Sequence, residues 1–446
     1  LCKPSAHHAA AWFGVTLAGG VACSLHVRET PERLGETLPW LGACVLVYDD
    51  DLAPLARTAL AGAPGTNCVA LSALSAPRDN TALDVFAVPI EADTLAAIIL
   101  SSGTTGRPKG VMHTHRTLIE NAKGGQQLYG TVTTRDAMLV VMQPSFAAWV
   151  NVVLPMVGGR GKIVFDETFA PTRYLATLER EAITMAPAVP TMWRAILAED
   201  TTRFDLSAIR NVSISGEPPV RADLEGIARK ICPAISSFYA SSEAGCASAV
   251  LATERDTLGE EGKPATTGKP VVGADLRIVD PSGSIDNELP RGETGEILVR
   301  GSSLAIGYWR DEALTRERFI DGWWRSGDLG RIDAEGDLFV EGRNDNRINS
   351  GGIKVHGEEI ERVLLAHPSV AQAAVIGVPD AQWGERIEAH VVLRPGAPSI
   401  DAAALDVFCR GEGGLADFKA PKAYHFVLTL PTGPTGKLYR RALRAG

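Results

Sequence analysis

The stretch that most constrains the fold is a short apolar run, Leu95 to Leu100, followed by ten residues with almost no bulky side chains, Ser101 to Gly110. The apolar run is typical of a buried β-strand, and the string S-S-G-T-T-G-R-P-K-G after it is typical of a loop. Glycines let such a backbone approach a ligand closely, hydroxyl groups donate hydrogen bonds, and Lys109 adds a positive charge. The stretch therefore predicts a strand that leads into a phosphate-binding loop.

This loop does not fit the common phosphate-loop pattern G-x-x-x-x-G-K-[ST]. Lys109 follows Arg107 and Pro108, and Gly110 stands where that pattern has a metal-binding hydroxyl. An ordinary P-loop NTPase or kinase is therefore disfavoured. The competing interpretation is a Gly/Ser/Thr-rich surface linker, but such linkers are rarely preceded by a buried strand.

Composition limits the partners of the chain. Its 446 residues, 45% of them hydrophobic, can bury a large core and are expected to form more than one domain. The net charge of -9, without a run of Lys and Arg, disfavours nucleic-acid binding. The uncharged stretch Ala9 to Leu25 contains glycines and lacks a basic flank, so it predicts a buried helix and strand rather than a membrane span. Seven scattered cysteines without a C-x-x-C pair favour a reducing, cytoplasmic setting.

The string S-S-G-T-T-G-R-P-K-G resembles the phosphate loop of the adenylate-forming superfamily, and four further strings follow in the order of that family. Tyr239 to Glu243 resembles Y-G-x-T-E, Trp324 to Gly330 resembles W-x-T-G-D-L-G, Gly342 to Gly352 resembles G-R-x-D-x-x-I-x-x-x-G, and Leu430 to Arg440 resembles P-x-T-x-x-G-K-x-x-R. The chain is therefore identified as a member of the acyl-CoA synthetase branch. The string S-G-E-P at residues 215–218 is similar to that of benzoate-CoA-ligase-like members.

The resemblance implies a role for each matching residue. Tyr239 is expected to stack on adenine, Asp328 to accept the ribose hydroxyls, and Glu243 to bind Mg²⁺. Thr104, Thr105, Glu243 and Lys437 are the expected catalytic residues. The expected ATP- and AMP-binding residues are Ser101, Ser102, Gly103, Thr104, Thr105, Gly106, Lys109, Gly216, Glu217, Pro218, Tyr239, Ala240, Ser241, Ser242, Asp328, Arg343 and Lys437. Ser350, Gly351 and Gly352 are expected to leave room for the pantetheine arm of coenzyme A.

An acyl pocket is expected at Phe146, Ala147 and Trp149, where family members carry this pocket and its gate. Acyl-CoA synthetases often have His at the place of Ala147, and amino-acid-activating enzymes have Asp there. A buried ammonium group without a carboxylate partner is costly, so an amino acid substrate is disfavoured. The competing interpretation of the two aromatic residues is ordinary core packing, which is the more common role of aromatic residues after a strand.

The fold class that the resemblance implies is α/β, with a large multi-subdomain N-terminal domain and a small mobile α+β C-terminal domain. The large domain, residues 1–344, is expected to hold parallel sheets and a distorted β-barrel; the small domain, residues 345–446, is expected to pivot at Asp345. The residue patterns add a strand at Val21 to Leu25 and a helix that starts near Thr114 and ends at Gly124-Gly125. Several tens of residues that precede the first helix in the family are expected to be missing.

The function that the resemblance implies is ATP-dependent joining of a carboxylic acid to coenzyme A through an acyl-adenylate, with release of pyrophosphate and AMP. An aryl or cyclic acid is the expected substrate, with a fatty acid as a further option, and Mg²⁺ is the expected metal ion. Two alternatives stay open: an adenylating enzyme that loads a carrier protein, and a nucleotide-binding homologue without catalysis. The sequence leaves the oligomeric state open.

Overall fold

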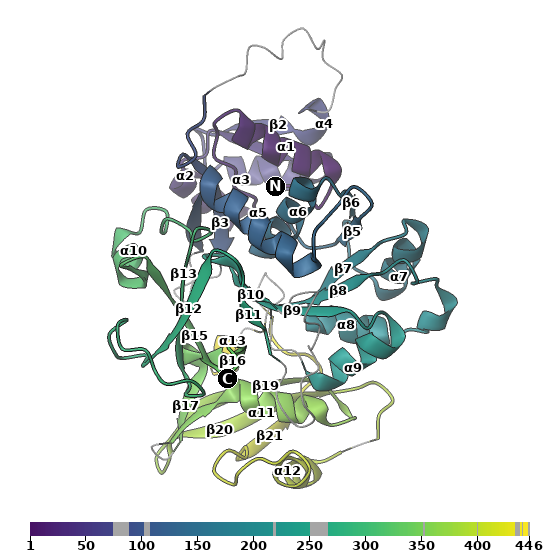
Figure 1. The fold of residues 1–446 in the computed structure, drawn as a ribbon, viewed down its shortest axis with the longest axis vertical. Coiled ribbons are helices and arrows are strands. Elements are labelled where there is room, and N and C mark those ends of the chain that lie inside the picture. Colours follow the sequence, from purple (N-terminus) through teal and green to yellow (C-terminus); the bar gives the residue numbers. More distant parts are fainter. Residues whose placement is uncertain are drawn as a thin grey trace.

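The computed structural model describes residues 1–446 except 75–88, 102–107, 217–219, 250–265, 351–352, 399, 433–437, 439 and 445–446; the side chains of Asp345, Lys354 and Arg441 are also outside the description. Figure 1 shows the N-terminal helices at the top of the view and the C-terminal sheet at the bottom, with the central strands between them. Among the described residues, no helix is long and apolar enough to cross a membrane.

The N-terminal elements pack around two short parallel strands. Thr30 starts the second helix by accepting a hydrogen bond from the backbone N–H of Arg33, as a helix N-cap does. Leu34 and Leu38 of that helix are buried against Leu46. The elements are α1 (Ala6–Leu17), α2 (Pro31–Leu41), β1 (Val45–Tyr48), η1 (Asp50–Leu52), α3 (Ala53–Leu60), β2 (Asn67–Ala70) and α4 (Leu71–Leu74), with β1 pairing β2.

The strand predicted before the loop is present as β3 (Leu95–Ser101), and its apolar run is buried. It pairs in antiparallel register with β4 (Lys109–Thr114), so the two strands flank the expected phosphate-binding loop. The strand predicted at Val21 to Leu25 is wrong. Pairing there is limited to a bridge between Ala22 and Ala97, because only Ala22 exchanges backbone hydrogen bonds with β3.

A seven-stranded sheet in the order β11-β10-β9-β8-β7-β5-β6 forms the centre, and β5 to β9 are parallel as predicted. Met138 packs toward α5 and α6, while its neighbour Leu139 packs toward α7, α8 and α9, because alternate strand residues face opposite sides. The elements are α5 (His115–Tyr129), β5 (Ala137–Val140), α6 (Ala147–Gly159), β6 (Lys162–Phe165), α7 (Pro171–Arg180), β7 (Met185–Ala188), α8 (Pro190–Leu197), η3 (Thr201–Arg203), β8 (Asn211–Ile214), α9 (Arg221–Lys230), β9 (Ile235–Ser241), β10 (Gly245–Ala249) and β11 (Lys269–Pro270).

The helix α5 runs past the glycines at which it was predicted to end. It continues to Tyr129 and ends at Gly130, which has a left-handed backbone conformation. Gly125 lies against α6, where a Cβ atom would overlap the ring of Pro155. Gly125 is therefore a place of close helix packing, and the prediction failed because it treated Gly124-Gly125 as a helix stop.

An antiparallel sheet and a small C-terminal sheet complete the chain. In the first, β13 and β15 lie at the centre, and β16 pairs β15. In the second, α11 and α12 cover one face, and β21 runs parallel to β20. The elements are β12 (Ala274–Val279), β13 (Gly295–Gly301), α10 (Glu312–Arg318), β14 (Phe319–Ile320), β15 (Trp323–Ile332), β16 (Leu338–Arg343), η4 (Asn344–Asn346), β17 (Arg347–Ser350), β18 (Ile353–His356), α11 (Gly357–Ala366), β19 (Val370–Asp380), β20 (Gly384–Leu393), α12 (Ala402–Arg410), β21 (Ala423–Phe426) and α13 (Arg440–Leu443).

Candidate active site

A cavity of about 490 Å³ lies where the central sheet, the β12–β16 sheet and the C-terminal elements meet. The central sheet contributes the end of β9, and the antiparallel sheet contributes β15 and β16. Helix α11 and the segments on both sides of residues 433–437 form a further wall. In Figure 1 these elements converge between the central strands and the C-terminal sheet.

A chain of hydrogen bonds joins three of the predicted nucleotide-binding residues. The Tyr239 hydroxyl donates to one carboxylate oxygen of Asp328 at 2.6 Å, and Arg343 donates to the other at 3.1 Å. Burial, together with the charge of Asp328, raises the pKa of Tyr239 well above its ordinary value, so this hydroxyl stays a donor. Each carboxylate oxygen has a further lone pair, so the group can still accept hydrogen bonds from a diol.

A second cluster holds Glu243 beside Tyr308. The Tyr308 hydroxyl donates to Glu243 at 3.0 Å and accepts from the indole N–H of Trp324 at 3.3 Å. Burial raises the pKa of Glu243, while the hydrogen bond from Tyr308 and the charge of Lys109 act in the opposite direction. The Lys109 ammonium lies 5.7 Å from the centre of the Tyr308 ring. The cluster thus places a buried carboxylate and an ammonium group at the same wall of the cavity.

Cations gather around Gly327 at this wall. A Cβ atom on Gly327 would lie 3.3 Å from an Arg318 nitrogen and 3.5 Å from an Arg343 nitrogen. Lys109 lines the same cavity, and burial, with help from the charges of Arg318 and Arg343, lowers the pKa of this lysine. Since the positive charges repel one another, the cavity favours an anionic ligand.

His113 supports the Tyr239–Glu243 segment from the neighbouring strand β4. Its Nε2–H donates to the Ser242 carbonyl at 2.8 Å, and its Nδ1 lies 3.1 Å from the Thr117 hydroxyl. Burial lowers the pKa of His113 to about 4, with a smaller opposing effect of the Ser242 carbonyl. The imidazole is therefore neutral near pH 7, and its tautomer is set by the carbonyl, which can only accept.

The C-terminal wall of the cavity carries a buried ion-pair cluster. Arg440 donates to both carboxylate oxygens of Glu361, at 2.9 and 2.7 Å, and lies 3.7 Å from Glu358. Glu361 also accepts from the backbone N–H of Val375 at 2.7 Å. These contacts fasten α13, which follows the Leu430–Arg440 motif, to α11 and β19.

The predicted site residues fall into three groups. Those that line the cavity are Ser101, Lys109, Gly216, Tyr239, Ala240, Ser241, Ser242, Glu243, Asp328 and Arg343. Those outside the described residues are Ser102, Gly103, Thr104, Thr105, Gly106, Glu217, Pro218, Gly351, Gly352, Lys437 and the side chain of Asp345. Thr432 and Leu438, which flank residues 433–437, line the cavity and form a β-bridge with each other.

The third group is not among the described residues that line this cavity. Ser350 ends β17 and pairs with Ile353 and Gly384 in the C-terminal sheet. Trp149 is fully buried and packs edge-on against His8 and Trp12 in the core. Phe146 lies with its ring centre 5.2 Å from that of His26. The acyl pocket at Phe146, Ala147 and Trp149 therefore stays a prediction.

Four residues of the site were missed by sequence reasoning: Tyr308, Trp324, Arg318 and His113. Tyr308 lies 65 positions from Glu243, and His113 lies 129 positions from Ser242. No spacing rule joins residues so far apart, although a tyrosine between Gly307 and Trp309 was a local signal. Trp324 stood in a quoted motif, but only its indole hydrogen bond to Tyr308 reveals its position.

The residues present fit a hard divalent cation together with a phosphate chain. Glu243 offers a buried carboxylate at the wall that holds Lys109, and Mg²⁺ prefers carboxylate and phosphate oxygens over nitrogen ligands. Asp328 is held by Tyr239 and Arg343. Glu243 is therefore the better candidate for the metal ligand.

Comparison with known proteins gives concordant matches along the chain. The family model of the AMP-binding enzyme matches residues 1–309, and that of the AMP-binding enzyme C-terminal domain matches residues 359–437. A feruloyl-CoA synthase from Amycolatopsis sp is 34% identical over 439 residues, which are 97% of this chain and 85% of the relative. A fatty acid–[acyl-carrier-protein] ligase, ScoC, from Streptomyces coeruleorubidus is 30% identical and covers 100% of this chain and 85% of its own length. The structure of ATP-bound MatB from Rhodopseudomonas palustris is similar with a TM-score of 0.86 at 28% identity, over 100% of this chain and 87% of that one.

Proposed function

Since this chain belongs to the AMP-binding enzyme family, in its acyl-CoA ligase branch, we propose that it joins a carboxylic acid to coenzyme A through an acyl-adenylate. In the first step, an oxygen of the acid bonds to the α-phosphorus of ATP and pyrophosphate leaves. In the second step, the thiol sulfur of coenzyme A bonds to the acyl carbon, AMP leaves with the electrons of the broken C–O bond, and the thiol proton goes to solvent. The two-part α/β fold expected from the sequence is that of the family and is confirmed.

The single observation that supports this most is that one cavity is lined both by a carboxylate that suits a diol and by a carboxylate and cations that suit a phosphate chain. Asp328, held by Tyr239 and Arg343, can accept hydrogen bonds from a ribose. Glu243, Lys109 and the cations near Gly327 suit the phosphates. A nucleoside triphosphate carries both groups, a neutral ribose diol and an anionic phosphate chain.

We assign the remaining roles by motif. Lys437, Thr104 and Thr105 would stabilise the negative charge that grows on the oxygens around the α-phosphorus. Glu243 would hold Mg²⁺, which when bound supplies neutralisation of the phosphate charge. Tyr308 would keep the Glu243 carboxylate oriented through its hydrogen bond, so that the group keeps a fixed position although it is buried.

The substrate we propose is an aryl or cyclic carboxylic acid. The feruloyl-CoA synthase relative supports an aromatic acid. Ala147 supplies no carboxylate for the ammonium of an amino acid. A fatty acid remains the second option, supported by the ScoC relative.

A second acceptor is supported by the same relative. ScoC is a fatty acid–[acyl-carrier-protein] ligase by name, so the acyl group of this chain has two candidate acceptors, coenzyme A and the phosphopantetheine thiol of a carrier protein. Both acceptors present a phosphopantetheine thiol, so the first half-reaction is the same for both. They are distinguished by the product, which is either an acyl-CoA or an acylated carrier protein.

We further propose a division at Asp345, with residues 1–344 as the large domain and residues 345–446 as the small one. The β12–β16 sheet ends at Arg343, and β17, which begins at Arg347, belongs to the C-terminal sheet. Rotation about Asp345 would withdraw Lys437 and bring Ser350, Gly351 and Gly352 over the site for the second step.

The test is release of AMP and pyrophosphate from ATP by the purified chain, with and without coenzyme A, across aryl, alicyclic, fatty and amino acids. Acid-dependent release that turns over only with coenzyme A supports the ligase. Pyrophosphate release without a CoA thioester, followed by acyl transfer to a carrier protein, supports the second acceptor. ATP binding without acid-dependent AMP formation with any acid would contradict both.

A further inference from the structure

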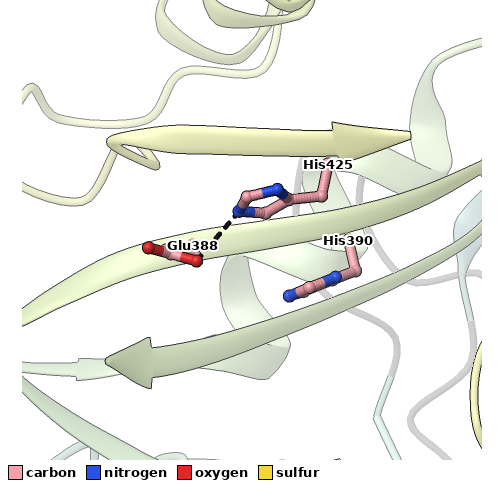
Figure 2. Close-up of side chains that lie close together, drawn as sticks. All are labelled: Glu388, His390 and His425. Atoms are coloured by element: carbon pink, nitrogen blue, oxygen red, sulfur yellow. Dashed lines mark hydrogen bonds and ion pairs between the residues drawn. The ribbon is translucent and has the colours of Figure 1, made fainter. Parts of the chain in front are cut away.

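Outside the nucleotide cavity, three metal-ligating side chains lie together on the C-terminal sheet. Glu388 and His390 stand two positions apart on β20, and His425 is the register partner of His390 on the parallel strand β21. Residues two apart on a strand share a face, and so do register partners, so all three side chains lie on one face of the sheet. Figure 2 shows the carboxylate and the two imidazoles side by side on adjacent strands.

The donor atoms of this cluster, which we call the Glu388–His390–His425 cluster, are already close. One ligand atom from each residue lies within 4.8 Å of the other two. Zinc with four ligands at about 2.0–2.2 Å holds its donor atoms roughly 3.3 Å apart. Small side-chain rotations, without a backbone shift, therefore bring the three donors to a metal distance.

One ring nitrogen of the cluster lacks a polar partner among the described residues. The two imidazole rings are stacked, with centres 4.7 Å apart and an angle of 24° between their planes. Nε2 of His390 is buried and has no hydrogen-bond partner among the described residues. A buried ring nitrogen without a partner costs free energy, and a metal ion is a ligand for its lone pair.

The surroundings of Glu388 leave one oxygen for a metal. Arg386 donates to Oε1 at 2.5 Å, while Oε2 lies 2.9 Å from Nε2 of His425. Arg386 therefore orients the carboxylate through its other oxygen, as hydrogen-bonding partners of metal ligands commonly do. The His425 side chain is 44% exposed, so an ion can enter from that side and keep a water as its fourth ligand.

We propose that the Glu388–His390–His425 cluster binds a borderline divalent cation of the Zn²⁺ type. Two imidazoles and one carboxylate suit zinc and its neighbours Co²⁺ and Ni²⁺, whereas Mg²⁺ prefers oxygen ligands. The site is separate from the proposed Mg²⁺ ligand Glu243 and does not depend on the proposed reaction.

Binding at this site has a structural consequence for the C-terminal part. Within the described sheet, β21 pairs only with β20. An ion held by His390 and His425 would cross-link these two strands. The chain after β21 leads to Leu430 and Thr432, which line the nucleotide cavity. A bound ion would therefore hold in place the strand that precedes this wall of the cavity.

The experiment is a Co²⁺ titration of the full, metal-stripped chain in excess Mg²⁺, followed by visible absorption and competition with Zn²⁺. One Co²⁺ per chain should bind with ligand-field bands of nitrogen and oxygen ligands. Glu388→Gln, His390→Gln and His425→Gln should each weaken binding by at least about tenfold, the lower end of the loss found for partners of metal ligands. His7→Gln, a change at an exposed histidine outside the cluster, is the matched control.

A second readout is thermal unfolding. Zn²⁺ should raise the Tm of the unsubstituted chain and of His7→Gln, but not that of His425→Gln. His425 is exposed, so this variant tests the site even where a change at the buried Glu388 impairs folding. Absence of Co²⁺ bands, equal affinity in His425→Gln, or a thiolate charge-transfer band from cysteine ligands would each overturn the proposal.

Discussion

At the scale of single residues, the Asp328 carboxylate accepts hydrogen bonds from Tyr239 and Arg343, one on each oxygen. Tyr239→Phe removes the 2.6 Å hydrogen bond and leaves the ring in place. A hydrogen bond to a charged group contributes about 1.5–3 kcal/mol, so KM for ATP should rise by about tenfold or more, with a smaller change in kcat. Tyr174→Phe, which removes a hydroxyl bonded to Pro187 in the core, is the control. Equal effects of the two changes on KM would contradict the ribose role.

Glu243 is a buried acid whose charge the site has to stabilise through Tyr308 and Lys109. Glu243→Gln keeps the shape and removes the charge. We expect acid-dependent pyrophosphate release to fall by at least about a hundredfold, as for the loss of one group that stabilises transition-state charge. The dependence of the residual rate on Mg²⁺ should also shift to higher concentration. Glu293→Gln, at an exposed position, should change neither the rate of pyrophosphate release nor its Mg²⁺ dependence. An unaltered Mg²⁺ dependence in Glu243→Gln would contradict the role of Glu243 as a metal ligand.

His113 contributes to the acid sensitivity of the fold through its buried imidazole. The folded pKa is about 4 because of burial, below the ordinary value of 6.5. The unfolded chain therefore takes up this proton first as pH falls, and stability that is complete above pH 6.5 is lost progressively down to pH 4. The loss is on the order of 3 kcal/mol for this residue. In urea unfolding, the free energy of unfolding of His113→Gln should depend less on pH in this window than that of the unsubstituted chain and of His7→Gln. Parallel curves for the three proteins would refute this role of His113.

At the scale of elements, α5 and α6 approach each other closely at Gly125. Gly125→Ala should lower the free energy of unfolding by about 1–3 kcal/mol, because the added Cβ overlaps Pro155. Gly14→Ala, within α1, meets no atom within 4 Å and should raise it by about 0.5–1 kcal/mol. Chemical denaturation of both variants checks the opposite signs. If both variants changed the free energy of unfolding in the same direction, the close packing of α5 and α6 at Gly125 would be contradicted.

The same helix shows what a sequence can and cannot predict. The helix near Thr114 was predicted, but Gly124-Gly125 was taken for its end, because the packing of Gly125 against Pro155, thirty positions later in another helix, leaves no local signal. In the site, Tyr239, Asp328 and Arg343 were predicted because each stands in a local motif. Tyr308 and His113 were not, since their partners are distant in the chain. The Glu388–His390–His425 cluster had a local signal in Glu-x-His on one strand, but His425 joins it only through the pairing of β20 with β21.

At the scale of the whole molecule, the proposed hinge separates the two half-reactions. Lys437→Ala should abolish pyrophosphate release while sparing thioester formation from supplied acyl-adenylate. Asp345→Pro should do the opposite, because proline fixes φ and restricts rotation at the pivot. Single-turnover assays measure the rate of each half-reaction in each variant, and each variant serves as the control for the other. Equal loss of both steps in both variants would refute the two-state scheme.

The cavity takes its walls from the large part of the chain and from α11 and the C-terminal segments. A ligand that fills it therefore touches both, and under the proposed rotation about Asp345 its binding free energy is coupled to the equilibrium between orientations of the two parts. By this linkage, a bound nucleotide would stabilise the orientation in which both parts contact it, and a change that moves the C-terminal part away would weaken nucleotide binding. Release of the product and movement of the C-terminal part away from the cavity would then be thermodynamically coupled.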